Sequence, residues 1–304
     1  MHKCSFKMTN FSRVICVIFV LAGWGCSAPT NVVMPPAPSS QWVNDCTDWD
    51  DWDKQGPPFR IYGNSYYVGT CGITAILVVG KEGHILIDGA TEAGADVIAN
   101  NIEALGFALK DIKILLNTHE HFDHAAGLAK LQQLSGAKLL SSSKAAPVLR
   151  TGVIAEADPQ FGMHDPFPAV NVDGILNEWE AVTLGNLSLI PIFTPGHTPG
   201  AVSWQWESCQ GEDCLSLVFA DSLSAVSSHE YRFSDHPIYV SFFKQSFDKL
   251  ATLDCDILLS THPSSSQMRK RLVNEGNLLR VDGCPSYAKK VSKMLMRRLD
   301  DEQK

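Results

Sequence analysis

A cluster of residues that can bind metal falls within one short segment, residues 119–124. Its candidate ligands are His119, His121, Asp123 and His124. The apolar run 112–116 precedes the segment and a helical pattern over 125–134 follows it, so we expect the cluster where a buried strand ends, the usual ligand position in α/β sheets. Imidazole nitrogen and carboxylate oxygen are standard zinc donors. Four candidates exceed what one tetrahedral ion with an open position needs, so the spacing predicts two metal ions side by side.

Two further histidines follow predicted strands in rigid turns. His197 lies in a Thr-Pro-Gly-His-Thr-Pro-Gly turn, and His262 lies in a Ser-Thr-His-Pro segment. Proline and glycine around a histidine fix its position, which a metal ligand needs, so both are predicted as ligands. We interpret the remaining histidines downstream of residue 28 as surface or hydrogen-bonded residues: His84, His164, His229 and His236.

Strands and helices alternate on both sides of these histidines. Strands are predicted at 60–62, 66–68, 75–79, 84–88, 112–116, 139–140, 180–182, 187–191, 202–206, 215–219 and 257–260. Helices are predicted at 91–105, 125–134, 144–149, 238–253, 267–279 and 287–299, the last an ordinary docked surface helix with one apolar stripe. The long irregular segment 153–177 contains three prolines and is of the kind that is often functional. Because each half of the chain runs from strands into helices, the pattern predicts an α/β fold with two sheets packed face to face and helices outside.

The first 28 residues have the pattern of an export signal. Three basic residues and no acidic ones accompany the apolar run 14–25 and the small residues after it. We therefore expect a signal peptide over 1–28 and a periplasmic protein without a transmembrane span. Lipid attachment at Cys26 is the less favoured alternative, because Gly23 stands where a lipoprotein signal prefers a branched apolar residue.

The composition of the rest of the chain predicts a leader followed by one domain. Residues 29–45 are rich in proline and serine and are predicted to be a flexible leader, with a single domain over 46–304. The formal net charge is -8, and removal of the three basic residues of the signal would lower it to -11. An acidic surface argues against nucleic acid as a partner. We expect a monomer that acts on small molecules.

Six cysteines remain after cleavage near residue 28, an even number that fits three disulfides in an oxidising compartment. Six cysteines allow fifteen pairings. Cys209 and Cys214 flank a hairpin-like turn and suit a local bridge. Cys46 would then pair with Cys71 and tie the N-terminal arm to the first strands. The remaining pair, Cys255 and Cys284, would tie the C-terminal region.

Taken together, the motifs resemble those of the metallo-β-lactamase superfamily. The matching residues are the pattern from His119 to His124, His197 in its turn, Asp221, His262, and Asp88 in an Ile-Asp-Gly sequence. Three features are most similar to subclass B3: His124 beside Asp123, serine at 222 where other subclasses have a cysteine ligand, and the six cysteines. The resemblance implies a four-layer αβ/βα sandwich with a dinuclear metal site at one edge of the sheets.

The resemblance also assigns roles by matching position. It implies a first zinc ion bound by His119, His121 and His197, and a second bound by Asp123, His124 and His262. Ser222 and Ser224 match positions that bind the substrate carboxylate, Gln160 matches a substrate-facing loop position, and Asp88 would support the ligands from behind.

The implied function is zinc-dependent hydrolysis of the β-lactam amide bond of penicillins, cephalosporins and carbapenems. Zinc lowers the pKa of bound water to about 7, which makes a metal-bound hydroxide available as the nucleophile. Asp123 would orient it and pass a proton to the nitrogen. The alternative is a glyoxalase II-type thioesterase or lactonase, in which Asp221 would bridge the metals. The export signal and the cysteines favour the lactamase.

Overall fold

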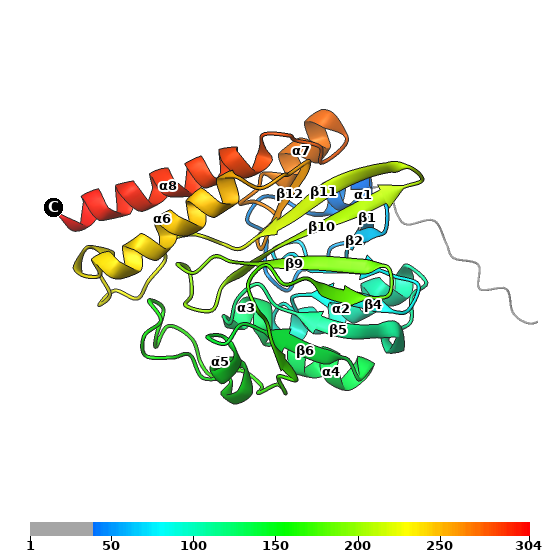
Figure 1. Cartoon of the computed structure of the whole chain (residues 1–304), viewed down its shortest axis with the longest axis horizontal. Helices are drawn as coiled ribbons and strands as arrows, with labels where there is room; N and C mark the ends of the chain where they lie inside the picture. The colour runs from blue at the N-terminus through cyan, green and yellow to red at the C-terminus, as the bar shows by residue number, and fades with distance from the viewer. Residues whose placement is uncertain (1–38) are drawn as a thin grey trace, which may run out of the picture. The chain divides into compact units, whose positions relative to one another are not determined.

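Two β-sheets lie face to face in the computed structural model, which describes residues 39–304 (Figure 1). The first sheet has the strand order β1-β2-β3-β4-β5-β6-β7, and the second has the order β12-β11-β10-β9-β8. The strands of the first sheet are β1 (Phe59–Tyr62), β2 (Ser65–Tyr67), β3 (Ile76–Val79), β4 (His84–Ile87), β5 (Ile112–Leu116), β6 (Lys138–Ser141) and β7 (Gly174–Ile175). Those of the second are β8 (Val182–Leu184), β9 (Leu187–Phe193), β10 (Val202–Gln210), β11 (Asp213–Ala220) and β12 (Ile257–Ser260).

Helices cover the outer face of each sheet. The helices are α1 (Ser39–Asp45), α2 (Glu92–Ala104), α3 (Phe122–Ala125), α4 (Leu128–Ser135), α5 (Ala146–Thr151), α6 (Pro237–Ala251), α7 (Met268–Glu275) and α8 (Gly283–Glu302). In Figure 1, α6 and α8 run side by side over the second sheet, whereas α2 and α4 lie with the first. Thr91 caps α2 by accepting a hydrogen bond from the Gly94 amide, as the sequence predicts.

Successive apolar side chains of a strand point to opposite faces of its sheet, and this alternation produces the layers of the fold. In β3, Ile76 and Val78 pack between the sheets, while Leu77 faces the core beneath α2 and α4. In β11, Phe219 packs between the sheets and Val218 packs against α6 and α8. Successive side chains of a strand point to opposite faces, so a strand covered on both sides is apolar throughout. The prediction of two packed sheets with helices outside is confirmed.

The predicted flexible leader is wrong over residues 39–45, which form helix α1. The side chain of Trp42 is buried and packs edge-on against Tyr67, with ring centroids 5.7 Å apart. Arg269 donates hydrogen bonds to the carbonyls of Val43 and Cys46 at the end of the helix. A helix this short is unstable alone and depends on such tertiary contacts, which composition does not reveal. The predicted signal peptide and Cys26 lie outside the described residues.

Several element boundaries also differ from prediction. The helix expected over 125–134 is divided into α3 and α4 around Gly127, where a Cβ would lie 2.1 Å from the Gly89 carbonyl oxygen. Consequently Asp123 and His124 sit in a helical turn rather than in a loop. Helix α7 is shorter than predicted and α8 is longer.

The structure contains the three expected disulfides. Cys46 is bonded to Cys71, Cys209 to Cys214 and Cys255 to Cys284. The second closes the β10–β11 hairpin, where the two cysteines are directly paired. The third joins the segment before β12 to the first turn of α8, so it fixes α8 to the second sheet.

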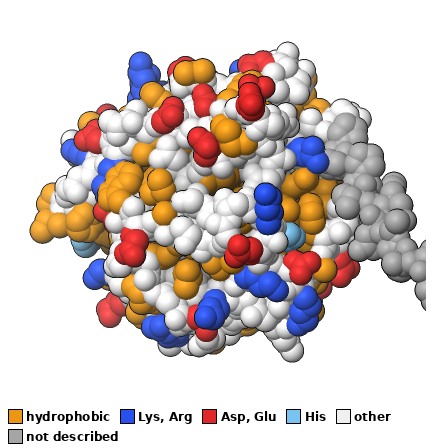
Figure 2. Space-filling view, turned by 45° about the vertical axis from the view of Figure 1, so that its right-hand side comes forward, with side chains coloured by type: hydrophobic (Ala, Val, Ile, Leu, Met, Phe, Trp, Pro, Cys, Tyr) orange, Lys and Arg blue, Asp and Glu red, His pale blue; other side chains and the backbone are white. Residues whose placement is uncertain are grey.

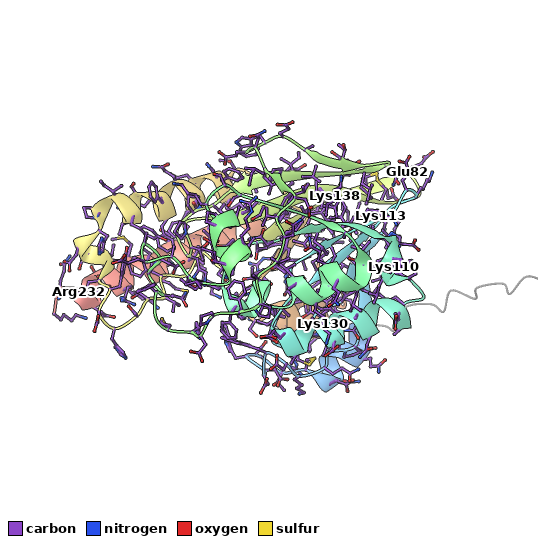
Figure 3. All side chains as sticks on the ribbon, turned by 90° about the horizontal axis from the view of Figure 1, so that it is seen from below. Glu82, Lys110, Lys113, Lys130, Lys138 and Arg232 are labelled. Carbon is purple, nitrogen blue, oxygen red and sulfur yellow. A yellow bond between two sulfur atoms is a disulfide. The ribbon has the colours of Figure 1, made fainter. Side chains whose placement is uncertain are left out.

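Charged side chains of both signs are interspersed on the face shown in Figure 2. In Figure 3, the labelled lysines Lys110, Lys113, Lys130 and Lys138 lie with the first sheet and its helices, whereas Arg232 lies near the C-terminal end of α8. Lys130 is paired with Asp96 at 2.6 Å. Among residues 39–304, no helix has the length and apolar composition needed to cross a membrane.

Candidate metal centre

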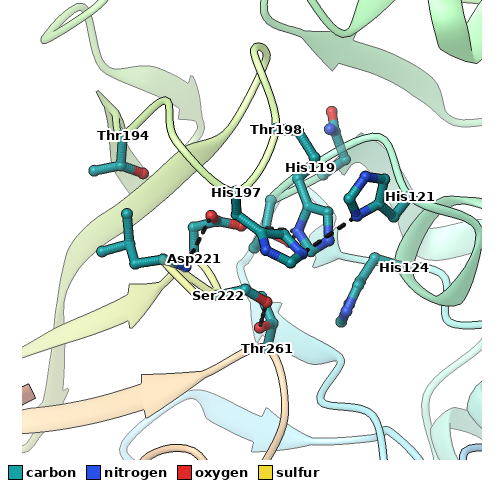
Figure 4. Close-up of polar contacts among 12 residues, drawn as sticks. His119, His121, His124, Thr194, His197, Thr198, Asp221, Ser222 and Thr261 are labelled. Carbon is teal, nitrogen blue, oxygen red and sulfur yellow. Dashed lines mark hydrogen bonds and ion pairs between the residues drawn. The ribbon is translucent and has the colours of Figure 1, made fainter. Parts of the chain in front are cut away.

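The predicted ligands come together at one edge of the two sheets. His119 follows β5, His197 lies in the turn between β9 and β10, and His262 follows β12. Ring centroids of His119 and His197 are 4.8 Å apart (Figure 4). Those of His124 and His262 are 5.1 Å apart. Residues from both halves of the chain therefore form a single cluster, as expected where strand ends meet.

Two overlapping sets of nitrogen and oxygen atoms in this cluster could hold metal ions. His119, His121 and His197 form one set, and His119, Asp123 and His124 form another, with the donor atoms of each set within 4.8 Å of one another. Oδ2 of Asp123 lies 3.1 Å from Nε2 of His124 and 3.4 Å from Nε2 of His262. Asp123 thus connects His124 to His262, the grouping expected around a second ion.

Each imidazole has one ring nitrogen held from behind. His119 Nδ1 lies 2.8 Å from Asp221 Oδ1, and His121 Nε2 lies 3.2 Å from Asp158 Oδ1. The other three contacts are His197 Nδ1 to the Ser224 carbonyl oxygen at 2.8 Å, His124 Nδ1 to Asp88 Oδ2 at 3.4 Å, and His262 Nδ1 to the Gly72 carbonyl oxygen at 3.2 Å. Metal-binding histidines usually have their second nitrogen held by a carboxylate or carbonyl in this way.

The nitrogens on the inner side fit a metal ion. Nε2 of His119 is buried and makes no hydrogen bond within residues 39–304, and Nε2 of His124 has Oδ2 of Asp123, a candidate ligand of the same cluster, at 3.1 Å. Burial, together with the charges of neighbouring histidines, keeps the pKa of His119 well below its usual value. The same causes lower the pKa of His197 to about 3. The neutral imidazoles of His119 and His197 are in the state that zinc requires, because its ligands must be deprotonated. Burial lowers the pKa of His124, but the carboxylates of Asp123 and Asp88 outweigh burial and raise it to about 10, so His124 would release a proton when it binds metal.

Asp221 lies behind His119 rather than among the inward donor atoms. Its Oδ1 contacts His119, and its Oδ2 accepts a hydrogen bond from the Leu223 amide at 3.4 Å. Both oxygens are therefore engaged away from the region between His119, His124 and His197. This position suits a residue that orients His119 and does not suit a ligand that bridges two ions.

Glu120 connects the two ligand-bearing turns. Its carboxylate accepts hydrogen bonds from the Thr198 hydroxyl at 2.7 Å and from the Gly200 amide at 2.9 Å. Burial raises the pKa of Glu120 to about 7. Because Glu120 lies between His119 and His121, these bonds fix the position of His197 relative to them.

A pocket of about 490 Å³ opens onto the cluster. Its lining includes the predicted substrate-facing residues Gln160, Ser222 and Ser224. Ser222 Oγ lies 2.7 Å from Thr261 Oγ1, and Gln160 Nε2 lies 3.4 Å from His197 Nε2. The pocket is of the size that small-molecule sites commonly have.

Several residues of this site were not predicted from the sequence. Helix α8, interpreted as an ordinary surface helix, lines the pocket with Tyr287, Lys290, Val291 and Met294, and His164 lines it too. The spacing of the α8 residues places them on one face of the helix, a signal that was present in the sequence but was assigned only to packing. Asp158 lies in the irregular segment 153–177, and no pattern in the sequence linked it to His121.

Known proteins with the same architecture include several metallo-β-lactamases. The structure of the MIM-2 metallo-β-lactamase is 51% identical, with a TM-score of 0.85, and the alignment covers 88% of this chain and 100% of that one. SMB-1 is 44% identical with a TM-score of 0.80, covering 83% and 100%. MEM-A1, a subclass B3 metallo-β-lactamase from a soil metagenome library, is 39% identical with a TM-score of 0.80, covering 83% and 99%.

Curated relatives are matched over shorter segments. A probable metallo-hydrolase of Methanocaldococcus jannaschii is 28% identical over 151 residues, 49% of this chain and 66% of that protein. A hydroxyacylglutathione hydrolase of Maricaulis maris is 30% identical over 110 residues, 36% and 34%. The chain thus spans less than two thirds of either protein.

Fold and site together define a metallohydrolase whose ligands extend from the edge of a sandwich of two sheets. The sequence model of the metallo-beta-lactamase superfamily matches residues 68–262, and the chain belongs to that superfamily. Solved structures that resemble it include subclass B3 enzymes.

Proposed function

We propose that this enzyme is a zinc-dependent β-lactamase that hydrolyses the amide bond of penicillins, cephalosporins and carbapenems. The observation that carries the proposal is the arrangement of Asp123 and five histidines, each histidine with one nitrogen directed into the cluster and the other held from behind. The identity of 51% to a metallo-β-lactamase over 88% of the chain supports the same reaction.

Two zinc ions would be held by residues that the structure brings together. His119, His121 and His197 would hold one ion, and Asp123, His124 and His262 would hold the other. When bound, zinc supplies a nucleophilic hydroxide at neutral pH and polarises the carbonyl that is attacked.

Asp123 is the residue that we assign to proton transfer. Burial raises the pKa of Asp123, but the nearby imidazoles of His124 and His262 outweigh burial and hold it well below the usual value. The side chain is therefore an ionised acceptor. It can accept a hydrogen bond from the attacking hydroxide, orient it, and help pass its proton to the departing amide nitrogen when the ring opens.

The carboxylate of a β-lactam has hydrogen-bond donors on one wall of the pocket. Ser222 and Ser224 are the donors expected from the sequence, and the structure suggests Lys290 as a third. Lys290 donates one hydrogen bond from Nζ to the Ser265 carbonyl at 2.8 Å, which leaves two ammonium protons for a ligand. Each hydrogen bond to a charged partner contributes about 1.5–3 kcal/mol. We expect Ser222→Ala with Ser224→Ala to raise KM for β-lactams without reducing zinc content.

The apolar rim suits the variable side chains that β-lactams carry. Trp49, Trp52, Met163 and Val226 line the pocket, and the side chain of Trp49 is 70% exposed. Aromatic and methionine side chains adapt to apolar groups of different shape. Gln160, on the loop that carries Asp158, would contact the same substrate.

A glyoxalase II-type thioesterase is the alternative that the hydroxyacylglutathione hydrolases among the relatives favour. It would need Asp221 as a bridging ligand. The contact between Asp221 and His119 Nδ1 argues against that role. The identity to relatives of that kind is also lower and covers less of the chain.

Hydrolysis assays with purified enzyme test the proposal directly. A penicillin, a cephalosporin, a carbapenem and S-lactoylglutathione are compared before and after removal of metal by a chelator, and again after zinc is restored. We expect hydrolysis of β-lactams that disappears with the chelator and returns with zinc. SMB-1 has been crystallised with mercaptoacetic acid, so this thiol should inhibit. Cleavage of S-lactoylglutathione without cleavage of any β-lactam would establish the alternative.

We also propose that the protein works as a monomer in the periplasm. The three disulfides support an oxidising compartment. Fractionation of cells that express the full chain tests the location, and light scattering tests the oligomeric state. Recovery of the protein with reduced cysteines in the cytoplasm would contradict it.

A further inference from the structure

A second cavity lies on the opposite side of the turn that carries His197. Its volume is about 580 Å³. It shares no lining residue with the pocket that opens onto the metal-binding cluster, which we call the catalytic pocket. Most of its wall is apolar, with Val148, Phe193, Pro195, Tyr239 and Phe242 among the residues that form it. Segments from both halves of the chain meet there, a common location for small-molecule sites.

Two polar groups at this cavity lack partners. The hydroxyl of Tyr239 is buried and has no hydrogen-bond partner in the part of the chain that the structure describes. Lys144 lines the same cavity, is exposed, and forms no ion pair within residues 39–304. A buried donor without a partner costs free energy, which a ligand with an acceptor group would recover. An unpaired ammonium at the edge of an apolar cavity favours an anionic group there.

We propose that this cavity is a second binding site, for a small amphipathic anion with an aromatic or aliphatic body. The body fills the space between Val148, Phe193 and Phe242, and the anionic group pairs with Lys144. An acceptor atom on the ligand accepts a hydrogen bond from the Tyr239 hydroxyl. Nothing in this assignment depends on the reaction at the metal centre.

A ligand in this cavity should change the geometry of the metal centre, because the turn that holds His197 forms part of the cavity wall. Pro195, Pro199 and Gly200 line the cavity and belong to the turn that holds His197. Glu120 also lines it and accepts the hydrogen bond from the Gly200 amide. A Cβ at Gly200 would lie 2.7 Å from Glu120 Oε2, so the turn is tightly packed against this carboxylate. A ligand that displaces the turn therefore moves His197 relative to His119 and His121.

Anilinonaphthalene sulfonate, which combines aromatic rings with an anionic group, is a suitable probe. Its fluorescence is titrated with zinc-loaded enzyme, with and without saturating mercaptoacetic acid. We expect one saturable site that the thiol does not displace. Lys144→Glu should weaken binding by about tenfold or more, the effect of losing one charge-assisted contact. Phe242→Asp should abolish saturable binding.

Ile238→Asp provides the matched control. Ile238 lies on the same helix as Phe242, is 74% exposed and does not line the cavity, so the probe should bind this variant as it binds the wild type. If Phe242→Asp fails to fold, Ala157→Trp on the exposed loop fills the cavity instead. Displacement of the probe by mercaptoacetic acid would overturn the proposal. Unchanged affinity in the Lys144 and Phe242 variants would also overturn it.

The effect on catalysis is a separate test that rests on the proposed function. With a chromogenic cephalosporin, the bound probe should lower kcat and leave KM within about twofold, because it acts through the turn and not by occupying the substrate pocket. A rise in KM alone would indicate competition at the catalytic pocket and would overturn the second site. Absence of all β-lactam hydrolysis would refute the proposed function. The binding titration would still show whether the cavity binds the anion.

Discussion

Substitution of Asp221 separates the two enzyme classes that this chain resembles. Asp221 Oδ1 lies 2.8 Å from His119 Nδ1, and both side chains are 0% exposed. We expect Asp221→Asn to weaken zinc binding without removing a ligand, because a side chain of the same shape still lies against Nδ1 but lacks the charge. In a glyoxalase-type site, the same substitution would remove a bridging ligand.

The size of the effect follows from the contact. Partners that hold the second nitrogen of a metal-binding histidine contribute about 10–100-fold to metal affinity, which corresponds to about 1.4–2.7 kcal/mol. Full burial prevents screening by solvent and salt, which places this pair toward the upper end. Asp221→Ala should cost more than Asp221→Asn, because it removes the 2.8 Å contact altogether and leaves His119 Nδ1 with only the longer 3.3 Å contact to Thr118 Oγ1 among the hydrogen bonds of residues 39–304.

Competition with a chromophoric chelator measures both quantities that matter, the affinity for zinc and the number of ions bound at saturation. We expect a lower affinity and an unchanged two ions per chain. Glu178→Gln serves as the control, since Glu178 is paired with Lys249 at 2.5 Å outside the site and should not change either quantity. Loss of one ion from Asp221→Asn at saturating zinc would refute the assignment and favour the bridging role.

Three further outcomes are expected. His124→Ala should leave one zinc ion per chain by metal analysis, whereas His164→Ala, at the edge of the same pocket, should leave two; equal zinc content in both would contradict the second site. Replacement of Cys255 and Cys284 by serine should lower the free energy of unfolding by about 3.6 kcal/mol, which denaturant titration would measure. This value is the loss of chain entropy expected for a disulfide that closes a 29-residue separation. Lys290→Met should raise KM for β-lactams about tenfold with kcat nearly unchanged, and Lys290→Arg should largely restore it; an unaffected KM in Lys290→Met would exclude a role in substrate binding.

The predicted layers and the cluster of ligands follow from local patterns in the sequence. His119, His197 and His262 each follow an apolar strand, which places them at one edge, because strand ends meet there whatever the details of packing. Cys209 and Cys214 could be paired for the same local reason, since they face each other across a hairpin.

The site and core residues that sequence patterns did not predict are positioned by contacts between distant segments of the chain. Asp158 supports His121 only because an irregular loop returns to the site, and no periodicity describes such a path. Lys290 lies in an amphipathic helix whose apolar stripe predicts that one face is buried but not what lies beside it. Trp42 anchors helix α1, which the proline- and serine-rich sequence around it did not predict. In each case the deciding partner is far away in the chain.

The distribution of ligands over both halves has a consequence for the assembly of the enzyme. His119 to His124 precede every strand of the second sheet in the chain, and His262 follows the last of those strands. Zinc bound to this set would act as a cross-link between the two sheets. By mass action, free zinc well above its dissociation constant would stabilise the joined state by several kcal/mol, about 2.7 at a hundredfold excess. Zinc supply during maturation would then determine the yield of folded enzyme as well as its activity, and chelation during refolding should lower the yield more than chelation of the finished protein.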